Sequence, residues 1–215
     1  IILFWKRLKL IDISTSNDNQ FSIIIPIRNE EENIGKLLLD LDNQSYSNQK
    51  FEVLVVNDHS SDNGIQIVWN LIPKVSYPLQ LINLPVDDFG KKAAITEGVN
   101  NSKNEVIVTT DGDCRVSTNW LTTINSAYES NVIFVFGRVG YHKNNNLFRM
   151  MQNIEMLVLG ATGGIQHYLG KVGMCNGANL SFRKNVFIEL NGYSGNEDLP
   201  TGDDEFLLRK IAAKY

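Results

Sequence analysis

Short apolar runs recur along the first half of the chain at a spacing that few folds can accommodate. Each run is rich in β-branched residues, as is typical of the buried strands of a parallel sheet. The runs are Phe21–Ile27, Phe51–Val56, Leu79–Leu84 and Val106–Val108. They begin roughly 25 to 30 residues apart, which is about the length of one βαβ unit. This spacing predicts an α/β fold with a doubly wound, mostly parallel sheet flanked by helices.

The segments between these runs have the apolar spacing of amphipathic helices. Ile34, Leu37, Leu38 and Leu41 recur at i, i+3, i+4 and i+7, so one face of this segment is expected to pack on the sheet. Another helix is expected to begin at Gly90, before the fourth run.

The second half of the chain has a different pattern. Val132–Phe136 is expected to form a strand, and Leu147–Leu159 a helix whose apolar stripe packs in the core. Gly160–Gly173 is rich in glycine, which predicts a mobile or closely approached loop. Cys175–Arg183 is expected to be a loop that enters a strand. Lys184–Leu190 is expected to be a short helix, because Asn-Gly follows it.

Polar clusters follow the predicted strands where each strand ends. They are Arg28–Glu30, Asn57–Asp62, Gly90–Lys92 and Asp111–Asp113. In an open α/β sheet, ligands bind in the crevice outside the carboxyl ends of the strands. Taken singly, Asp58 suits either a base or ribose hydrogen bond or a cap on the next helix, and Lys91 suits either a phosphate or solvent. The convergence of these clusters on one edge favours a nucleotide site.

Asp111 and Asp113 are separated by a glycine directly after the fourth run. Two carboxylates held close together repel each other unless a positive charge lies between them. Mg²⁺ usually takes one or two protein carboxylates together with substrate phosphates. An ordinary strand-end turn, in which Asp and Gly are common, explains the same residues, so both interpretations stay open.

A last acidic cluster, Gly202-Asp203-Asp204-Glu205, opens a predicted helix near the end of the chain. Thr201 can cap this helix, and acids suit its first turn. If this turn faces the crevice, one of its carboxylates can serve as a general base on a hydroxyl group.

Composition excludes several classes of protein. The formal net charge is −4, so no nucleic-acid partner is expected. The two cysteines form neither a metal motif nor a disulfide framework, which favours a reducing compartment. The first βα turn carries no Walker A sequence and no Gly-x-Gly-x-x-Gly, which argues against a P-loop NTPase and a standard NAD site.

The start of the chain has two interpretations. Ile1–Trp5 is apolar, and Lys6, Arg7 and Lys9 follow it, as at the cytoplasmic end of a membrane helix or in an ordinary terminal segment. We divide the chain into two parts. Residues 1–20 form a lead-in, which lies near a membrane in the first of these interpretations. Residues 21–215 form a domain that is expected to be truncated at its C-terminus. The expected location is cytoplasmic, at the cytoplasmic face of a membrane in the full-length protein.

Six motifs occur in a characteristic order. They are Ser-Ile-Ile-Ile-Pro-Ile-Arg-Asn-Glu, Val-Val-Asn-Asp-His-Ser-Ser-Asp, Gly-Lys-Lys-Ala-Ala, Asp-Gly-Asp, Asn-Gly-Ala-Asn-Leu-Ser-Phe-Arg and Gly-Asp-Asp-Glu-Phe. Over about residues 21–213 this order strongly resembles the family 2 glycosyltransferases, inverting enzymes of the GT-A fold. Each motif alone is loose, but six at the right spacing are specific. The resemblance adds a small antiparallel, acceptor-side part to the expected sheet.

The resemblance implies a nucleoside-diphosphate sugar as donor, usually UDP-linked, and Mg²⁺ or Mn²⁺ as cofactor. Asp58 matches the acid that contacts the base, and Lys91 matches a lysine near the donor. Asp111 and Asp113 match the Asp-x-Asp motif, in which the last acid ligates the metal and the first lies near the ribose and the metal. Pro26, Arg28 and Glu30, in the first motif, are assigned to substrate binding.

The resemblance also implies an acceptor that is a saccharide or is linked to a lipid, in polysaccharide or glycolipid synthesis. Asn176 and Asn179 lie in the segment that resembles the acceptor-side loop. Asp204 matches the catalytic base, and Asp203, assigned to substrate binding, stands where Glu is commoner in the family.

Two alternatives remain beside this interpretation. A sugar nucleotidyltransferase also uses an α/β sheet and Mg²⁺, but usually has a glycine-rich first loop, which Pro26–Glu32 lacks. A catalytically silent nucleotide-sugar-binding domain is the other. The Gln-x-x-Arg-Trp motif of processive synthases is absent, but the chain ends at Tyr215, so processivity stays open.

Overall fold

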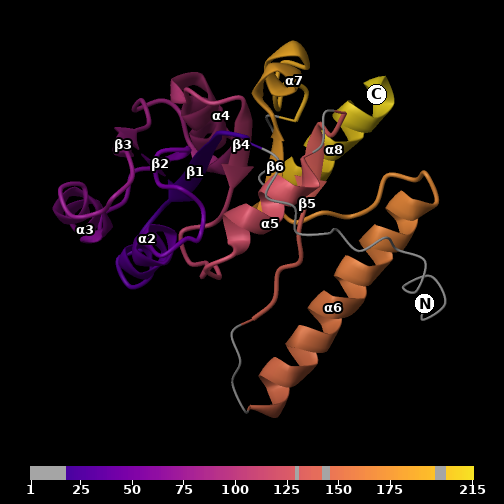
Figure 1. Ribbon diagram of the computed structural model, residues 1–215, viewed down its shortest axis with the longest axis horizontal. Helices are drawn as coiled ribbons and strands as arrows, with labels where there is room; N and C mark the ends of the chain where they lie inside the picture. The colour runs from indigo at the N-terminus through magenta and orange to yellow at the C-terminus, as the bar shows by residue number, and fades with distance from the viewer. Residues whose placement is uncertain (1–17, 129–130, 142–145, 197–201) are drawn as a thin grey trace.

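A six-stranded sheet forms the centre of the molecule, with strand order β3-β2-β1-β4-β6-β5 (Figure 1). The computed structural model describes residues 18–128, 131–141, 146–196 and 202–215. The strands are β1 (Phe21–Ile27), β2 (Phe51–Asn57), β3 (Leu79–Asn83), β4 (Val106–Thr109), β5 (Phe134–Phe136) and β6 (Leu180–Arg183). The helices are α2 (Ile34–Asp42), α3 (Gly64–Leu71), α4 (Gly90–Asn101), α5 (Trp120–Ala127), α6 (Leu147–Tyr168), the 3₁₀ turn η1 (Gly177–Asn179), α7 (Lys184–Glu189) and α8 (Asp203–Lys214).

The sheet is parallel on one side and antiparallel on the other. β1 pairs in parallel with β2 and with β4, so Ile24 lies between Leu54 and Thr109 in the register, and β2 pairs in parallel with β3. β6 runs antiparallel to both of its neighbours, β4 and β5. The predicted α/β fold, mostly parallel with a small antiparallel part, is therefore confirmed.

Helices cover both faces of the sheet because successive strand residues point to opposite faces. Ile23 and Ile25 are fully buried in the core that includes residues of α2, α3 and α5. Ile24 is fully buried in the other core, with residues of α4, α7 and α8. Burial on both faces explains why the strand sequences are continuous apolar runs rather than alternating ones.

The expected loop over Gly160–Gly173 is wrong over most of its length, because α6 continues to Tyr168. Glycine is unfavourable in a helix by about 1 kcal/mol relative to alanine, which is why the sequence indicates a loop. A Cβ on Gly163 would collide with the carbonyl oxygen of Met174. The glycine therefore lets the chain that follows α6 pack directly against the helix.

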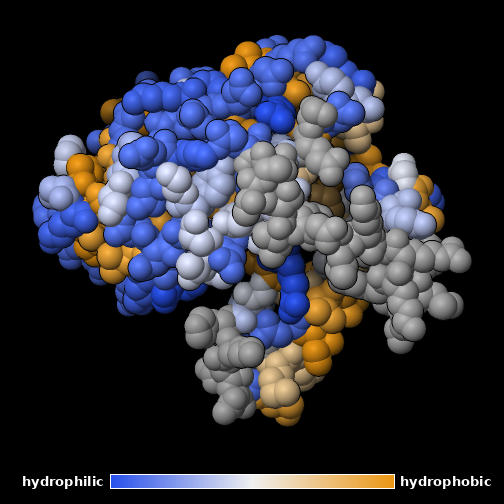
Figure 2. All heavy atoms as spheres, in the orientation of Figure 1, coloured by the Kyte–Doolittle hydropathy of each residue, from blue (hydrophilic) through white to orange (hydrophobic). Residues whose placement is uncertain are grey.

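The expected packing of the α6 stripe in the core is also wrong. Phe148, Met151 and Ile154 are 65%, 61% and 61% exposed. Figure 1 shows α6 projecting away from the sheet, and Figure 2 shows hydrophobic residues along it. Its contacts with the rest of the described chain include a hydrogen bond from the Tyr141 amide to Asn153 Oδ1, at 2.9 Å. Among the described residues, no helix has both the length and the apolar character needed to cross a bilayer.

Gly98 of α4 and Gly164 of α6 form a matched pair for a stability test. An added Cβ on Gly98 would lie 2.5 Å from Cγ2 of Ile24, whereas no atom lies within 4 Å of one on Gly164. We expect Gly98→Ala to lower the free energy of unfolding by about 1–3 kcal/mol through overpacking. Gly164→Ala should raise it by up to about 1 kcal/mol through helix propensity. Urea denaturation followed by circular dichroism measures both, and a stabilised Gly98→Ala would contradict the close packing.

Candidate active site

The loops after β1, β2 and β4 and the start of α4 enclose a cavity of about 350 Å³. It is lined by Pro26, Ile27, Arg28, Glu30, Asp58, Lys91, Asp111, Gly112 and Asp113. Every residue that the sequence assigned to the donor side, from Pro26 to Asp113, therefore lines a single hollow. It lies at the carboxyl ends of the parallel strands, where the topology places a ligand.

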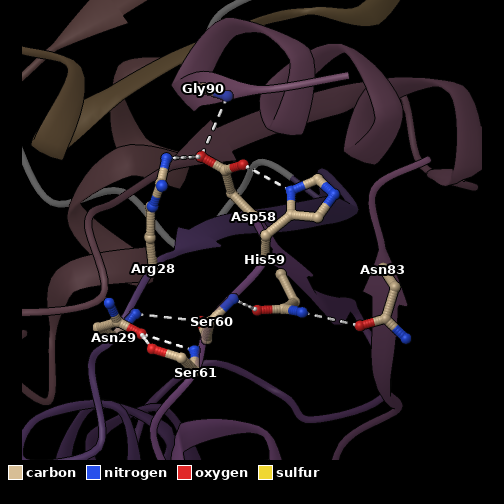
Figure 3. Close-up of polar contacts among 9 residues, drawn as sticks. Arg28, Asn29, Asp58, His59, Ser60, Ser61, Asn83 and Gly90 are labelled. Carbon is tan, nitrogen blue, oxygen red and sulfur yellow. Dashed lines mark hydrogen bonds and ion pairs between the residues drawn. The ribbon is translucent and has the colours of Figure 1, made fainter. Parts of the chain in front are cut away.

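Asp58 is a buried acid that joins three segments of the chain (Figure 3). Its Oδ2 accepts a hydrogen bond from the Gly90 amide at 3.0 Å and lies 3.7 Å from the Arg28 guanidinium. Its Oδ1 lies 3.1 Å from Nδ1 of His59, whose ring stacks on Phe89 with the centroids 4.5 Å apart. Asp58 therefore binds the start of α4 rather than capping the next helix, α3.

The loops after β1 and β2 are tied together by neutral hydrogen bonds (Figure 3). The Asn29 amide donates to Ser60 Oγ at 3.0 Å, and the Ser61 amide donates to Asn29 Oδ1 at 2.8 Å. Asn57 Oδ1 accepts from the Ser60 amide at 3.0 Å, while its Nδ2 donates to Asn83 Oδ1 at 2.9 Å. These bonds fix the wall of the cavity that carries Arg28 and Asp58.

Lys91, in the first turn of α4, forms an ion pair with Asp111, and Nζ lies 2.5 Å from Oδ1. Burial lowers the pKa of Lys91, but the Asp111 carboxylate, helped by Asp203 and Asp204, more than offsets this, so the pKa is raised. The ammonium group is therefore held in its charged form between acids from two distant parts of the sequence.

The helix α8 brings its acids to the same place. Asp204 Oδ2 accepts from the Gly177 amide at 2.9 Å, and its Oδ1 accepts from the Glu205 amide at 2.7 Å. A Cβ on Gly177 would lie 3.3 Å from Lys91 Nζ and 3.5 Å from Asp203 Oδ2. The first turn of α8 therefore lies beside Lys91, next to the crevice, but Asp203 and Asp204 are not among the residues that line the 350 Å³ cavity. Thr201, the expected cap, lies outside the described residues.

Asp203 has a raised pKa. Burial is the largest cause, the Lys91 ammonium opposes it, and the Asp204 carboxylate adds to it. Burial likewise raises the pKa of the nearby Cys175 thiol to about 12, with help from Asp204, Glu205 and Asp203. Negative charge is thus already crowded around the first turn of α8.

A larger cavity of about 750 Å³ adjoins the first and shares Asp111 and Asp113 with it. The predicted residues Asn176 and Asn179 line this cavity. Asn179 Oδ1 accepts from the Trp120 indole at 3.0 Å, and its Nδ2 donates to the Arg138 carbonyl at 3.1 Å. Asn179 is therefore bonded to its own structure as well as facing the cavity.

Several lining residues of this larger cavity were missed by the sequence analysis. Arg138, Tyr141 and Met156 belong to it because the segment after β5 and one residue of α6 border this cavity. Nothing local marks them as site residues. The one available signal was the Gly137-Arg138 pair directly after a predicted strand, since strand ends carry sites in this fold class.

Asp111 and Asp113 have the chemistry of ligands for a divalent cation. Among the residues that the structure describes, no group of three or more His, Cys, Asp or Glu side chains could hold a metal ion by itself. Asp111 and Asp113 nevertheless line one cavity, and Asp113 is exposed. Two carboxylates suffice for Mg²⁺ or Mn²⁺ when substrate phosphates and water supply the other ligands.

Comparison with known proteins decides the family. The sequence model of the family described as Glycosyl transferase family 2 matches residues 22–190. The chain belongs to this family. Glycosyltransferase AglE of Haloferax volcanii is 28% identical to this family 2 chain over 200 residues, which is 90% of the chain and 62% of AglE.

Another relative of the family 2 chain is the undecaprenyl-phosphate 4-deoxy-4-formamido-L-arabinose transferase of Yersinia enterocolitica. It is 28% identical over 148 residues, which is 66% of the chain and 44% of that protein. The chain thus spans less than two thirds of the length of both relatives.

Solved structures agree on the fold. Mannosyltransferase PcManGT from Pyrobaculum calidifontis, in complex with GDP-Man and Mn²⁺, has a TM-score of 0.70 at 19% identity, covering 99% of this chain and 59% of its own. TarS of S. aureus, in complex with UDP-GlcNAc, has a TM-score of 0.63 at 20% identity, covering 89% and 52%. The GT-A fold expected from the sequence is confirmed.

The raised pKa of Asp203 predicts a pH effect on stability. The folded state holds this proton more tightly than the unfolded chain, so stability falls as pH rises from the ordinary value of 3.8 through the folded pKa. Asp203→Asn removes the titrating carboxyl group, so the variant does not lose this stability as pH rises. We expect the free energy of unfolding of the variant, relative to the unsubstituted protein, to be higher at pH 7 than near pH 4. Urea denaturation at both pH values measures the difference, and a constant difference would contradict the assignment.

Proposed function

We propose that residues 21–215 form one catalytic domain that transfers a sugar from a nucleoside-diphosphate sugar, UDP-linked, to a hydroxyl group of a saccharide or lipid-linked acceptor. The proposed reaction inverts the anomeric configuration and belongs to polysaccharide or glycolipid synthesis. The observation that carries the proposal is the position of Lys91, which pairs with Asp111 and whose pKa is also raised by the carboxylate of Asp204. Asp111 lines both the proposed donor-side cavity and the proposed acceptor-side cavity.

Similar proteins support both proposed substrates. PcManGT was solved with GDP-Man and Mn²⁺, and TarS with UDP-GlcNAc. A relative from Rhizobium johnstonii is described as dodecaprenyl-phosphate galacturonate synthase. On this basis we also place the whole protein at the cytoplasmic face of a membrane, where lipid-linked acceptors are found.

The donor side has a group for each part of a nucleotide sugar. The buried Asp58 is placed to accept a hydrogen bond from the base, and the Arg28 guanidinium lies 3.7 Å from its Oδ2. Lys91 lies at the start of α4, where backbone amides and the helix dipole also favour a phosphate. Mg²⁺ or Mn²⁺ held by Asp111 and Asp113 would offset the charge that develops on the departing diphosphate.

The acceptor side supplies the base. Asp204 is held by the amides of Gly177 and Glu205, so its carboxylate is fixed before the substrate arrives. Asp204 takes the proton of the acceptor hydroxyl, and that oxygen forms a bond to the anomeric carbon. The bond from that carbon to the diphosphate oxygen breaks on the opposite face, and its electron pair leaves with the diphosphate. This single displacement inverts the configuration and needs no covalent enzyme intermediate.

Asp204→Asn tests the assignment of the base. We expect turnover to fall by at least about 100-fold, because general base catalysis contributes a factor of that order or more. UDP binding should stay within about twofold, since the variant keeps the size of the side chain. UDP release from a UDP-sugar panel gives the rate and calorimetry gives the affinity. Unchanged turnover would remove Asp204 as the base. Pyrophosphate consumption by the unsubstituted protein would instead indicate a nucleotidyltransferase, and UDP binding with no turnover a silent binding domain.

Asp113→Asn tests the proposed metal ligand. With Mn²⁺ present we expect its Kd for UDP to rise about tenfold or more, because the cation loses one of its two protein carboxylates. Chelation by EDTA should weaken UDP binding to the unsubstituted protein by a similar factor and change the variant little. Calorimetry with and without Mn²⁺ measures all four values. Equal Mn²⁺ dependence in the two proteins would contradict the role of Asp113.

A further inference from the structure

An apolar cavity of about 320 Å³ lies between α6 and the segment that follows β5. Phe136 and Val139 form one wall, Leu157 and Ala161 of α6 form another, and Met174 contributes from the segment after α6. Arg138 is the one charged residue in its lining. The 350 Å³ cavity is lined by four carboxylates and the 750 Å³ cavity by two, whereas this one is lined by none among the described residues.

The apolar cavity opens into the proposed acceptor site. It shares Arg138, Val139, Met156 and Asn176 with the 750 Å³ cavity that contains Asp111 and Asp113. A molecule bound across both would place a polar end beside the acids and an apolar end against α6.

Glycines keep this space open. Gly160 of α6 lines the cavity, and no atom lies within 4 Å of the position that its Cβ would take. One turn further on, Gly163 packs against the Met174 carbonyl. At Gly163 the helix α6 therefore packs directly against the segment that contains Met174, while a gap remains beside Gly160.

Arg138 stands where the two cavities meet. Its side chain is exposed, and none of the ion pairs formed within the described ranges involves it. A guanidinium in this position suits an anionic oxygen group such as a phosphate, which it can bind through two parallel hydrogen bonds.

We propose that this cavity binds the hydrocarbon chain of a lipid-linked acceptor, with Arg138 on an anionic head group such as phosphate. This rests on the proposed sugar transfer, and it favours a lipid over a free saccharide as the acceptor. At about 30 Å³ for each water-sized group, the cavity holds about ten methylene groups. That is far less than a peptide helix, about 10 Å wide, would require. A single extended chain that continues from the acceptor site fits both the size and the continuity.

Alkyl phosphates of different length, kept below micelle-forming concentrations, test the cavity directly. Each buried methylene should tighten binding by about three- to fourfold. We therefore expect dodecyl phosphate to bind at least tenfold more tightly than butyl phosphate, as measured by calorimetry. Arg138→Gln should weaken the binding of dodecyl phosphate and leave the binding of the uncharged dodecyl maltoside unchanged. An equal loss of affinity for both ligands, or no loss for either, would overturn the role of Arg138.

Gly160→Phe and Gly164→Phe distinguish the effect of filling the cavity from the effect of adding a phenylalanine anywhere on α6. Both substitutions lie on α6 at positions where no atom is within 4 Å of an added Cβ, and Gly164 does not line the cavity. Phenylalanine at position 160 should fill the gap, so Gly160→Phe should lose the preference for dodecyl over butyl phosphate. Gly164→Phe should keep it. Equal behaviour of the two variants, whether both keep or both lose the preference, would overturn the proposal.

Other occupants give different results, and each would overturn the proposal. Dimers that Gly160→Phe abolishes, seen by size-exclusion chromatography with no dodecyl phosphate binding, would assign the cavity to a second copy. Phosphatidylcholine vesicles bound equally by both variants, again without dodecyl phosphate binding, would assign α6 to a bilayer surface.

UDP binding separates this proposal from the proposed function. If UDP and UDP-sugars fail to bind while the chain-length preference persists, the proposed sugar transfer is contradicted, but the proposed binding of a hydrocarbon chain in the cavity is supported. If UDP binds and UDP-sugars turn over on soluble saccharides without any chain-length preference, the transfer stands and the lipid cavity fails.

Discussion

The Lys91 ammonium is the charge on which the rest of the site depends. It lies 2.5 Å from Asp111, and its raised pKa also reflects the carboxylates of Asp203 and Asp204. These acids come from the end of β4 and the start of α8, and without a cation between them they would repel one another in a partly buried hollow. The lysine thus allows the end of β4 and the start of α8 to lie close together.

The sheet and the donor side could be predicted because their signals are local. β-Branched runs at a regular spacing specify strands, and the topology places the residue after each strand at one edge. The partner of Asp58 was not predictable in this way. The Gly90 amide lies 32 residues further along the chain, and only the folded arrangement brings it to the carboxylate.

The errors concern α6, where local pattern and tertiary context disagree. Periodicity identifies an amphipathic helix but does not say what its apolar face meets. Likewise, glycine predicts a break in a helix, but the contact of Gly163 with the Met174 backbone makes a side chain at that position impossible. The acceptor side was therefore the part least accessible from sequence, because distant segments build it.

The hydrogen-bond ladder between β4 and β6 fixes the distance between the end of β4 and the turn that contacts Asp204. Thr109 pairs with Leu180 and its Oγ1 donates to the Gly177 carbonyl at 2.8 Å, while the Gly177 amide holds Asp204. An extra residue between Gly177 and Leu180 would either move the Gly177 amide away from Asp204 or shift the register of β6. A shift of one residue would turn every side chain of β6 to the other face of the sheet. The stretch from Gly177 to Leu180 is therefore expected to accept substitutions more readily than a change in its length.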